Sequence, residues 1–470
     1  MIKQVLWSKD ELSKALGQKI HQETHDIIGV SIDTRTIEKG DIFLAIKGNN
    51  FDGNAFANEA IGKGASLCII DDIYKVSEKN RDKVVLVNDV TNALNSMAKY
   101  RRNSLKGKVI GITGSVGKTS TKEMLSLALS ACGKTYASLK NFNNHYGLPL
   151  SLVRTPIDTE FCILELGMSA TGEIRDLSKI AQPNIAIITN VEAVHLQSFD
   201  SIAEIAYAKA EIFKNIKASS FGILNIDNIY YDILYQQACR SGVQTIAFGN
   251  SAKSDCYIKE IKYLANGEQL IDINCLGKDI QQKFCKDVGK HLIFNSLAVF
   301  ACLNLLKVNM TAAQKALEKF TPFTGRGKIT ILSNNIILID ESYNASPVAV
   351  AVSIENLVSR KKENSRAIAV LGDMKELGKE EIKFHQNINL KGIDKVFCVG
   401  QLMKQLYDKT YHDIRGAFAS NAEEMAKIIL NHIQENDIIL VKGSHSMNMK
   451  LIVEKLLLAT LKTPLLFLGS

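Results

Sequence analysis

A short glycine-rich loop offers the clearest chemistry in the sequence. The segment 113–119 reads TGSVGKT, follows an apolar strand and precedes a long helical stretch. At such a junction, unpaired N–H groups and the helix dipole both face an anion. Gly114 and Gly117 allow the backbone to approach a phosphate closely. Lys118 can reach the β and γ phosphates of a nucleotide, and the Thr119 hydroxyl can bind Mg²⁺. The loop therefore predicts a site for a nucleoside triphosphate.

The loop departs from the commonest phosphate-binding template, G-x-x-x-x-G-K-[ST]. That template needs glycine where this chain has Ile112, and the glycines fall instead at positions 111, 114 and 117. The alternative interpretation is a glycine-rich turn with a chance Gly-Lys-Thr. The strand before the loop and the helix after it favour the nucleotide site. The predicted ATP-binding residues of this loop are Gly114, Ser115, Val116, Gly117, Lys118, Thr119 and Ser120.

Two further side chains follow apolar strands and could bind a metal ion. Glu165 ends the strand 161–165, and His195 comes shortly after the strand 185–189. The carboxyl ends of parallel strands are where ligands bind, and carboxylate oxygen suits Mg²⁺. The sequence alone leaves alternatives open, because Glu165 could be an ordinary loop acid and His195 could cap a loop. Lys209 by itself has the pattern of a surface lysine.

Composition bounds the class of protein that carries these residues. The chain has 470 residues, of which 46% are hydrophobic and 23% charged, as in a globular protein of about three domains. The net charge of +8 is scattered, and a single Trp offers no stacking surface for bases, which argues against nucleic-acid binding. Nine dispersed cysteines without a C-x-x-C pair indicate a reducing cytoplasm. The polar N-terminus and the absence of a long apolar run predict no signal peptide and no membrane span.

Strand and helix signals alternate along most of the chain. This alternation predicts an α/β fold with mostly parallel, doubly wound sheets. Residues 255–284 alternate polar and apolar side chains instead, which favours short antiparallel strands. The segment 451–468 predicts a closing helix and strand. The predicted strands are 40–46, 65–70, 84–87, 109–113, 161–165, 185–189, 221–225, 336–340, 367–371, 396–399 and 438–441.

The predicted domains are separated by a helix and by a glycine-rich junction. The helix is 92–102, and the junction is 321–327, after which a second α/β pattern begins. We predict an N-terminal domain at 1–88, a central ATP-binding domain at 89–323 and a C-terminal domain at 324–470.

Taken together, these segments resemble the Mur ligase family over essentially the whole chain. The family's phosphate loop, T-G-[TS]-x-G-K-[TS], matches residues 113–119. The resemblance implies a small N-terminal α/β UDP-binding domain, a central ATPase-like sheet and a C-terminal Rossmann-like domain. The other matching segments are Leu164-Glu165-Leu166-Gly167, Thr189-Asn190-Val191 with His195, Ala208-Lys209 with Glu211-Ile212-Phe213, Gly289-Lys290-His291 with Asn295-Ser296-Leu297-Ala298, and Gly325-Arg326-Gly327.

Within the family, the chain is similar to the branch that adds D-alanyl-D-alanine to UDP-N-acetylmuramoyl-tripeptide. The stretch 371–378, LGDMKELG, with His385 downstream carries this most specifically. Residues 141–150, 340–347 and 442–449 resemble other stretches of that branch. The chain departs from the family's usual residues at His145, Leu292, Glu341, Ser346, His445 and Asn448.

The resemblance implies an amide ligase that uses ATP and two Mg²⁺ ions through an acyl phosphate. Thr119 and Glu165 would hold one ion, and His195 with a carbamylated Lys209 would hold the other. Excess negative charge at the phosphate would be neutralised by Lys118, by the metal ions and by Arg326 from the junction. The implied catalytic set is Lys118, Lys209, His195 and Arg326.

The resemblance also places the remaining ligand contacts. Adenine would lie at His291 and Asn295, the ribose hydroxyls at Asp340, and Tyr343 near the nucleotide. Because Arg326 belongs to the hinge, we expect the site to be completed by closure of the C-terminal domain. The implied substrate-binding residues are Ser31, Asp33, Thr34, Arg35, Asn49, Asn50, Phe51 and Asn344, although the Asp, Asn and Gly residues of the N-terminal stretches also suit ordinary turns.

Several rival functions stay open at this point. A related ligase could add one amino acid, diaminopimelate or lysine, to the dipeptide precursor; a folylpolyglutamate synthetase fits less well. A P-loop phosphotransferase and a nucleotide switch without catalysis are rivals from other classes. The sequence determines neither the third residue of the tripeptide nor the oligomeric state, for which a monomer is our expectation.

Overall fold

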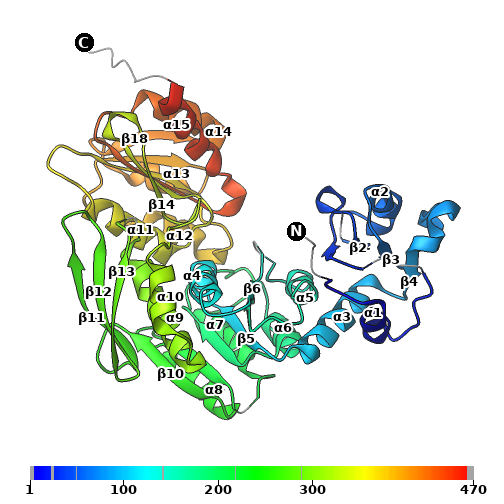
Figure 1. Cartoon of the computed structure of the whole chain (residues 1–470). Helices are drawn as coiled ribbons and strands as arrows, with labels where there is room; N and C mark the ends of the chain where they lie inside the picture. The colour runs from blue at the N-terminus through cyan, green and yellow to red at the C-terminus, as the bar shows by residue number, and fades with distance from the viewer. Residues whose placement is uncertain are drawn as a thin grey trace.

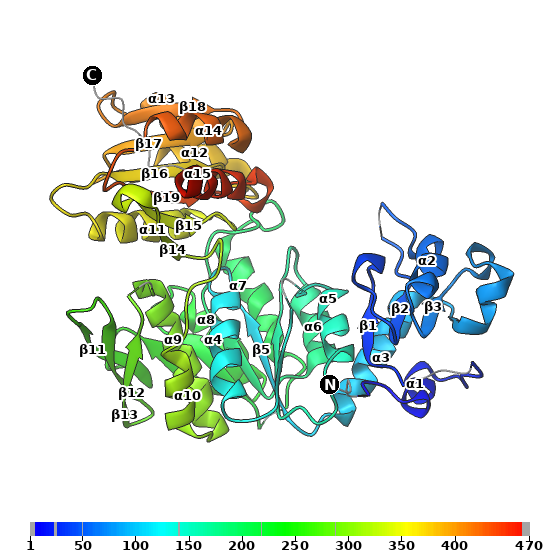
Figure 2. The ribbon, with the colours of Figure 1, turned by 45° about the horizontal axis from the view of Figure 1, so that its top comes forward.

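Three β-sheets follow one another along the chain in a computed structural model, and each organises one part of the molecule (Figure 1). The structure describes residues 5–22, 26–48, 50–139, 142–217, 219–286 and 288–462, with side chains described as far as residue 459. The N-terminal unit and the C-terminal domain lie on different sides of the central domain, as a second view also shows (Figure 2).

The N-terminal sheet has four parallel strands in sequence order. They are β1 (Gly29–Ser31), β2 (Asp41–Leu44), β3 (Leu67–Ile70) and β4 (Val84–Leu86). Helices α1 (Lys9–Leu16) and α2 (Ala57–Gly62) belong to this unit, and α3 (Val90–Ser104) leads out of it. Asp89 caps the first turn of α3 by accepting a hydrogen bond from the Asn92 N–H at 2.6 Å, which explains where this helix begins.

The central sheet has nine strands in the order β13-β12-β11-β10-β9-β8-β5-β7-β6. Its strands are β5 (Lys108–Thr113), β6 (Thr135–Ala137), β7 (Phe161–Glu165), β8 (Ile185–Ile188), β9 (Phe221–Asn225), β10 (Gln244–Gly249), β11 (Cys256–Tyr263), β12 (Gln269–Cys275) and β13 (Lys278–Phe284). Neighbours from β6 to β11 pair in parallel, and β11, β12 and β13 pair antiparallel. Both predictions for this region, the parallel sheet and the antiparallel strands, are confirmed.

Helices connect the parallel strands of the central sheet, and two more follow its last strand. The connecting helices are α4 (Lys118–Ser130), α5 (Gly147–Val153), α6 (Glu173–Ala181), α7 (Ile202–Ala210) and α8 (Tyr231–Arg240), whereas α9 (Lys290–Leu306) and α10 (Met310–Leu317) follow β13. Because β5 pairs with both β7 and β8, the loops after these three strands emerge side by side at one edge of the sheet.

The C-terminal sheet has the order β14-β15-β19-β16-β17-β18, and only β14 pairs antiparallel. Its strands are β14 (Lys328–Ile331), β15 (Ile337–Glu341), β16 (Ala367–Gly372), β17 (Lys395–Val399), β18 (Arg415–Ala419) and β19 (Ile438–Lys442). Its helices are α11 (Pro347–Ser359), α12 (Glu381–Gln386), α13 (Met403–Lys409), α14 (Ala422–Ile428) and α15 (Lys450–Lys462). The strand predicted at the end of 451–468 lies beyond the described residues.

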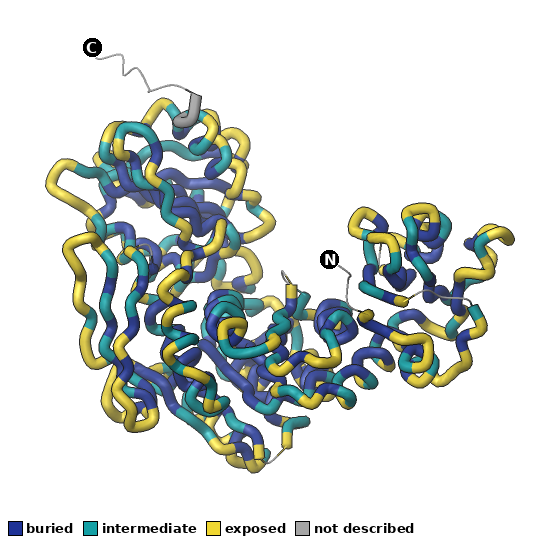
Figure 3. The backbone as a smooth tube through the Cα atoms, in the orientation of Figure 1, coloured by how far each residue is buried: buried dark blue, intermediate teal, exposed yellow. Residues whose placement is uncertain are grey.

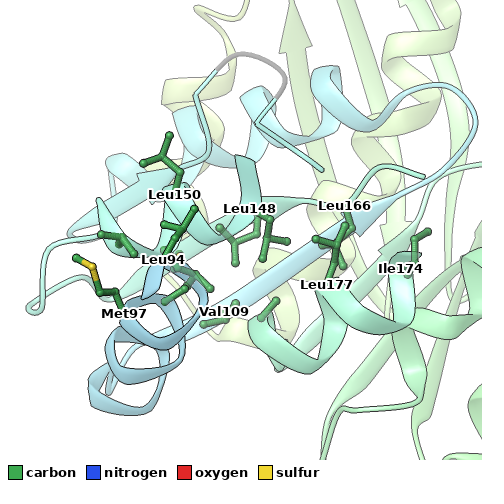
Figure 4. Packing of buried hydrophobic residues seen from close by; sticks show 14 of the residues in the cluster. Leu94, Met97, Val109, Leu148, Leu150, Leu166, Ile174 and Leu177 are labelled. Atoms are coloured by element: carbon green, nitrogen blue, oxygen red, sulfur yellow. The ribbon is translucent and has the colours of Figure 1, made fainter. Parts of the chain in front are cut away.

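One hydrophobic cluster joins the N-terminal unit to the central domain. Leu94 and Met97 of α3 lie with Leu148 and Leu150 of α5 in a single buried cluster, which also contains Trp7 (Figure 4). The buried clusters of the C-terminal domain contain only that domain's own residues, and among the described residues no cluster spans it and the central domain. The backbone coloured by burial shows the dark-blue interior of each domain (Figure 3). The C-terminal domain is therefore the one whose buried core, among the described residues, is separate from that of the central domain.

Five strands are absent from the sequence predictions. Four of them, β1, β6, β14 and β18, lie at the edges of their sheets. Edge strands are short and only partly buried, so their hydrophobic signal is weak. The fifth strand, β10, has the sequence QTIAFG, and its first two residues are polar.

Within the described ranges, no helix is long and apolar enough to cross a membrane.

Candidate active site

The phosphate loop lies between β5 and α4, and two of its positions require glycine for steric reasons. Gly114 and Gly117 have φ angles of 151° and 86°, which L side chains rarely adopt. A Cβ atom on Gly114 would lie 2.0 Å from Thr189 Oγ1, and one on Gly117 would lie 2.9 Å from Asn295 Nδ2. The loop is thus packed between the end of β8 and the first turns of α9, and the predicted nucleotide residue Asn295 lies beside it.

Lys118 folds back over the loop from the first turn of α4. Its Nζ donates to the carbonyl oxygens of Gly114 and, at 3.3 Å, Ser115. Burial lowers the pKa of the Lys118 ammonium; the Glu165 carboxylate opposes this shift, and Arg326 adds to it. The N–H groups at the start of α4 have no partner within the helix, as at every helix N-terminus. Cation and N–H donors therefore converge, as an anion site requires.

Glu165, at the end of β7, meets two polar side chains. Its Oε2 accepts a hydrogen bond from Thr119 Oγ1 at 3.0 Å, and its Oε1 accepts one from Asn143 Nδ2 at 2.9 Å. The Glu165 residue is only 3% exposed. Hydroxyl and carboxylate oxygens in contact are the ligand types that Mg²⁺ prefers. The structure thus brings together Thr119 and Glu165, the two residues predicted to hold one metal ion.

Lys209, near the end of α7, is buried rather than exposed. Lys209 is 2% exposed, so the interpretation of this residue as a surface lysine is wrong. Burial lowers the pKa of the Lys209 ammonium well below its usual range, and the Lys118 cation lowers it further. Among the described residues, no carboxylate lies within ion-pair distance of Lys209. A buried amine without a carboxylate partner is favoured in its neutral, nucleophilic form.

His195 lies in the loop after β8 and contacts the C-terminal domain. Its Nδ1 pairs with Oε2 of Glu376. Burial lowers the pKa of the His195 imidazole, the Glu376 carboxylate raises it, and the Lys209 and Lys118 cations lower it further, with a net lowering. Lys118, Lys209 and His195 therefore lie within electrostatic reach of one another, which agrees with their predicted membership of one site.

The hinge between the domains is held by Asp340 at the end of β15. One carboxylate oxygen of Asp340 accepts from the Gly325 N–H at 2.7 Å, and the other accepts from Ser342 Oγ at 2.6 Å. Arg326 Cζ lies 3.9 Å from the centroid of the Tyr343 ring, in a cation–π arrangement. Asp340, Arg326 and Tyr343 are thus brought together as predicted, and in this conformation Asp340 shapes the hinge.

Two other predicted residues contact the C-terminal domain's interior. His291, at the start of α9, has its Nδ1 3.3 Å from Asn356 Nδ2 of α11, across the domain boundary. The backbone oxygen of Asn344 accepts from Lys442 Nζ at 3.1 Å, and the Asn344 side chain bonds to the next backbone N–H at 2.9 Å. Among the described residues, neither the His291 nor the Asn344 side chain forms a hydrogen bond with the phosphate loop.

Two of the predicted substrate residues, Ser31 and Asp33, lie in a separate place and line a cavity of about 540 Å³ between the first two domains. Tyr136 and Arg154 of the central domain line the same cavity. The Arg35 side chain bonds to Asp33 and lowers the pKa of that carboxyl to about 2. The predicted contacts Asn50 and Phe51 are not among the described residues that line this cavity. Thr34 is buried beside Asp33. Asn49 lies outside the described residues.

A second cavity, of about 370 Å³, opens next to the phosphate loop. It lies at the carboxyl ends of β8, β9 and β10, and Phe294 of α9 contributes to its wall. Its polar lining comes from Asn190, Glu192, Asn225, Asp227, Asn228 and Asn250. Ser115 joins this wall to the loop, since its N–H donates to the Asn190 oxygen at 2.9 Å and its Oγ donates to the Glu192 oxygen at 3.1 Å.

Three residues near the site are absent from the predicted set. Asn143 and Glu376 stand in motifs whose resemblance is clear, 141–150 and 371–378, but no spacing rule links either to a metal ligand. Arg154, whose Nε donates to the Val30 oxygen at 2.7 Å, carries no motif signal. Their contacts join segments that are distant in the chain, so only the folded structure identifies them.

The donor set fits a magnesium site better than a site for a softer metal. In the described part of the chain, no group of three or more His, Cys, Asp or Glu side chains is arranged to hold a metal ion. The Thr119–Glu165 pair supplies oxygen ligands only, which suits Mg²⁺ when phosphate oxygens and water complete its shell. The residues present therefore fit the metal that the resemblance implies.

Family models match all three parts of the chain. The model described as "Mur ligase family, catalytic domain" matches residues 26–102. The "Mur ligase middle domain" matches residues 112–303, and the "Mur ligase, glutamate ligase domain" matches residues 325–445.

The chain is also similar to whole proteins of known name. UDP-N-acetylmuramoyl-tripeptide–D-alanyl-D-alanine ligase of Rickettsia prowazekii is 36% identical, covering 96% of this chain and 99% of its own. A crystal structure of MurF from Acinetobacter baumannii superposes with a TM-score of 0.83 at 26% identity, over 96% of this chain and 98% of that one. MurF ligase from Thermotoga maritima in complex with ADP gives a TM-score of 0.79 at 26% identity, over 97% and 100%. The predicted three-domain α/β fold is confirmed.

Proposed function

The chain belongs to the Mur ligase family, and from this premise we propose that it joins D-alanyl-D-alanine to UDP-N-acetylmuramoyl-tripeptide. ATP is converted to ADP and phosphate, and the product is the UDP-muramoyl-pentapeptide used in peptidoglycan synthesis. One observation carries the proposal: the likeness to the Rickettsia ligase extends over 96% of this chain. A phosphotransferase or a switch would need to share only the nucleotide-binding part.

The proposed reaction has two steps. A carboxylate oxygen of the tripeptide attacks the γ-phosphorus of ATP, and ADP leaves, which gives an acyl phosphate. The amine of D-alanyl-D-alanine then attacks the acyl carbon, loses a proton, and phosphate leaves with the electron pair of the broken C–O bond. The first step brings anions together, so fixed cations lower its barrier. Lys118 and Arg326 are the side chains that serve this purpose.

Magnesium ions would be held by the residues described above. Thr119 and Glu165 would hold one ion, with Asn143 fixing the carboxylate, and His195 and Lys209 would hold another. When bound, Mg²⁺ neutralises phosphate charge and orients the phosphate oxygens. The chain's own contribution is to place these ligands at one edge of the sheet, with Glu165 and Lys209 buried, and to lower the pKa of the amine and of the imidazole.

Carbamylation of Lys209 would convert its buried amine into an oxygen ligand. The neutral amine attacks carbon dioxide and loses a proton, which gives a carbamate. Burial of Lys209 without a carboxylate partner supports this modification. Enzyme equilibrated with ¹³C-labelled carbon dioxide should show a carbamate signal in its NMR spectrum that is missing in Lys209→Ala. Equal signals in both proteins would argue against the modification.

The nucleotide and the UDP-linked substrate would occupy the two ends of the site. Asn295 and His291 would contact adenine, Asp340 the ribose and Tyr343 the nucleotide near Arg326. The cavity lined by Ser31 and Asp33 supports a place for the UDP-muramoyl group. Thr34, Arg35, Asn50, Phe51 and Asn344 stay as predicted substrate contacts.

The setting of the enzyme is also part of the proposal. We place it in the cytoplasm as a monomer, and its nine free cysteines support a reducing compartment. Domain boundaries at 88/89 and 323/324 are proposed because they fall between the strands of successive sheets.

The test is phosphate release from ATP with defined acceptors and with the mass of the product measured. Release is expected only when D-alanyl-D-alanine and a UDP-muramoyl-tripeptide are both present, and the tripeptides with diaminopimelate and with lysine are assayed separately. Release with a single free amino acid and the UDP-dipeptide would assign the chain to another ligase branch. Phosphate transferred to one acceptor would indicate a kinase, and release without any acceptor would indicate a switch.

Arg326 tests whether the C-terminal domain completes the site. Arg326→Ala should lower kcat by about 100-fold or more, because a cation that faces the transferred phosphate is lost. Tyr343→Phe keeps the ring on which the guanidinium stacks and serves as the control. Closure also excludes water from the acyl phosphate. Unchanged turnover in Arg326→Ala would contradict this role.

A further inference from the structure

A loop of the C-terminal domain reaches the central domain at His195. The loop, residues 373–378, follows β16, and its Glu376 carboxylate contacts His195 Nδ1. Two residues further on, a Cβ atom on Gly378 would lie 2.9 Å from the carbonyl oxygen of Leu196. Side chain and backbone therefore dock at the same place. The residue that the loop contacts is one of the predicted metal ligands.

The loop is fixed from within its own domain. The Met374 N–H donates to His385 Nε2 at 2.9 Å, and His385 is fully buried. The Lys375 N–H donates to Ser444 Oγ at 2.8 Å. These bonds hold the two residues that precede Glu376, so its carboxylate is presented by a rigid segment. This gives a physical purpose to His385 and Ser444, which the proposed function leaves without a task.

The backbone is unusual on both sides of the contact. His195 has a φ angle of 58° and Glu376 one of 66°. Residues with a Cβ atom adopt this left-handed region rarely and at an energetic cost, and such conformations concentrate where function fixes them. The two unfavourable conformations face each other across the domain boundary, which indicates that the contact itself is the feature being maintained.

We propose that Glu376 is a positioning residue for His195. Its carboxylate accepts a hydrogen bond from the Nδ1–H group, which fixes the tautomer and leaves Nε2 for the metal ion, as carboxylates do for many metal-binding histidines. Because Glu376 belongs to the C-terminal domain, His195 is oriented only when that domain is docked. The inference rests on the proposed function, since the metal role of His195 belongs to it.

A contribution to domain docking alone does not account for the contact. The Glu376 side chain is 53% exposed and that of His195 is 31% exposed. Ion pairs with this much solvent contribute little to stability. The value of the pair therefore lies in the orientation of the imidazole, and its loss should be visible at the metal rather than in the fold.

The test compares Glu376→Ala, Glu376→Gln and the control Glu380→Gln in the full-length enzyme. Glu380 is an exposed carboxylate on the same segment and pairs only with Lys383 among the described residues. The probe is Mn²⁺, titrated by electron paramagnetic resonance in the presence of a non-hydrolysable ATP analogue. Glu376→Ala should weaken one class of Mn²⁺ site by about 10- to 100-fold and lower kcat similarly. Glu376→Gln should recover most of both, because its amide oxygen still accepts a hydrogen bond from the Nδ1–H group. Glu380→Gln should match the wild type.

The outcomes separate this inference from the proposed function. Wild-type Mn²⁺ affinity in Glu376→Ala would overturn the positioning role, as would tighter binding, which would mean that the carboxylate competes with the metal for His195. If Glu376→Ala fails to fold, the test rests on Glu376→Gln. A loss of Mn²⁺ affinity in Glu376→Gln as large as that expected for Glu376→Ala would refute the hydrogen-bond argument. A wild-type enzyme that makes no pentapeptide refutes the proposed function whatever the variants do.

Discussion

Asn143 and Asn144 are neighbours in the chain and have different tasks. The Asn143 amide donates to Glu165, whereas Asn144 Oδ1 accepts from the N–H of Gly147, the first residue of α5, at 2.9 Å. The first contact orients a predicted metal ligand, and the second satisfies a helix end. Residue type is the same at both positions, so the difference in role comes entirely from what each side chain reaches.

This pair gives a prediction with its own control. Asn143→Ala should lower kcat/KM by about 10- to 100-fold with little change in Tm, since it releases one oxygen of Glu165. Asn144→Ala should keep activity and lose about 1 kcal/mol of stability, or about 2–4 °C in Tm. Steady-state kinetics and thermal unfolding of both variants check this. Equal losses of activity in Asn143→Ala and Asn144→Ala would contradict separate roles for the two side chains.

At the scale of elements, a buried ion pair joins two strands of the C-terminal sheet. Lys442 Nζ at the end of β19 lies 2.9 Å from Glu341 Oε2 at the end of β15, and the Lys442 side chain is only 6% exposed. Ser353 of α11 donates to the same oxygen at 2.5 Å. Burial raises the pKa of the Glu341 carboxyl, but Lys442 and its hydrogen bonds outweigh this and leave a net lowering. The pair therefore fixes the edge of the sheet that faces the hinge.

Breaking the pair should destabilise the C-terminal domain. Lys442→Met leaves the Glu341 carboxylate buried without its partner and should cost about 3–5 kcal/mol in the free energy of unfolding. Lys450→Met removes an exposed pair with Glu454 on α15 and should cost less than about 0.5 kcal/mol. Urea unfolding measures both. Similar losses in the two variants would mean that the buried pair has no special weight.

The same pair predicts a dependence on pH. The folded pKa of Glu341 is lower than its ordinary value of 4.5, so the folded domain binds fewer protons than the unfolded chain. The resulting stability is present above that ordinary value and is lost as the pH falls below it. Glu341→Gln should therefore show a smaller loss of stability than wild type between neutral and acidic pH. An identical acid dependence in both proteins would contradict the assignment.

At the scale of the whole molecule, the distribution of hydrophobic clusters divides the chain unevenly. The N-terminal unit shares a cluster with the central domain, whereas the C-terminal domain has clusters of its own. Among the described residues, its contacts with the central domain include the polar pairs His195–Glu376 and His291–Asn356 and the close approach of Gly378 to Leu196. This division supports the expectation that the C-terminal domain moves about residues 325–327, as completion of the site by that domain would require.

Unfolding should follow this division. The only Trp, Trp7, is buried at the junction of the first two domains and donates to the Val153 oxygen at 2.9 Å, so its fluorescence reports that junction. Leu94→Ala should lower the stability seen by Trp7 by about 2–5 kcal/mol. Leu440→Ala, in β19, should leave the Trp7 transition unchanged and lower a separate transition seen by circular dichroism. A common shift of both signals would mean that all three domains unfold together.

The sequence by itself predicted the phosphate loop, the parallel α/β pattern and the strand-end positions of candidate metal ligands. These features are local, because glycine spacing, hydrophobic periodicity and a residue's position at a strand end are properties of short segments. Glu165 is the clearest case: its place at the end of a predicted parallel strand makes it a candidate ligand, the resemblance pairs it with Thr119, and the folded chain brings the two into contact. Only the tertiary structure decided that Lys209 is buried, that Asn143 bonds to Glu165 and that Glu376 reaches His195. Burial and contacts between distant segments depend on how the domains pack, and no spacing along the chain encodes that directly.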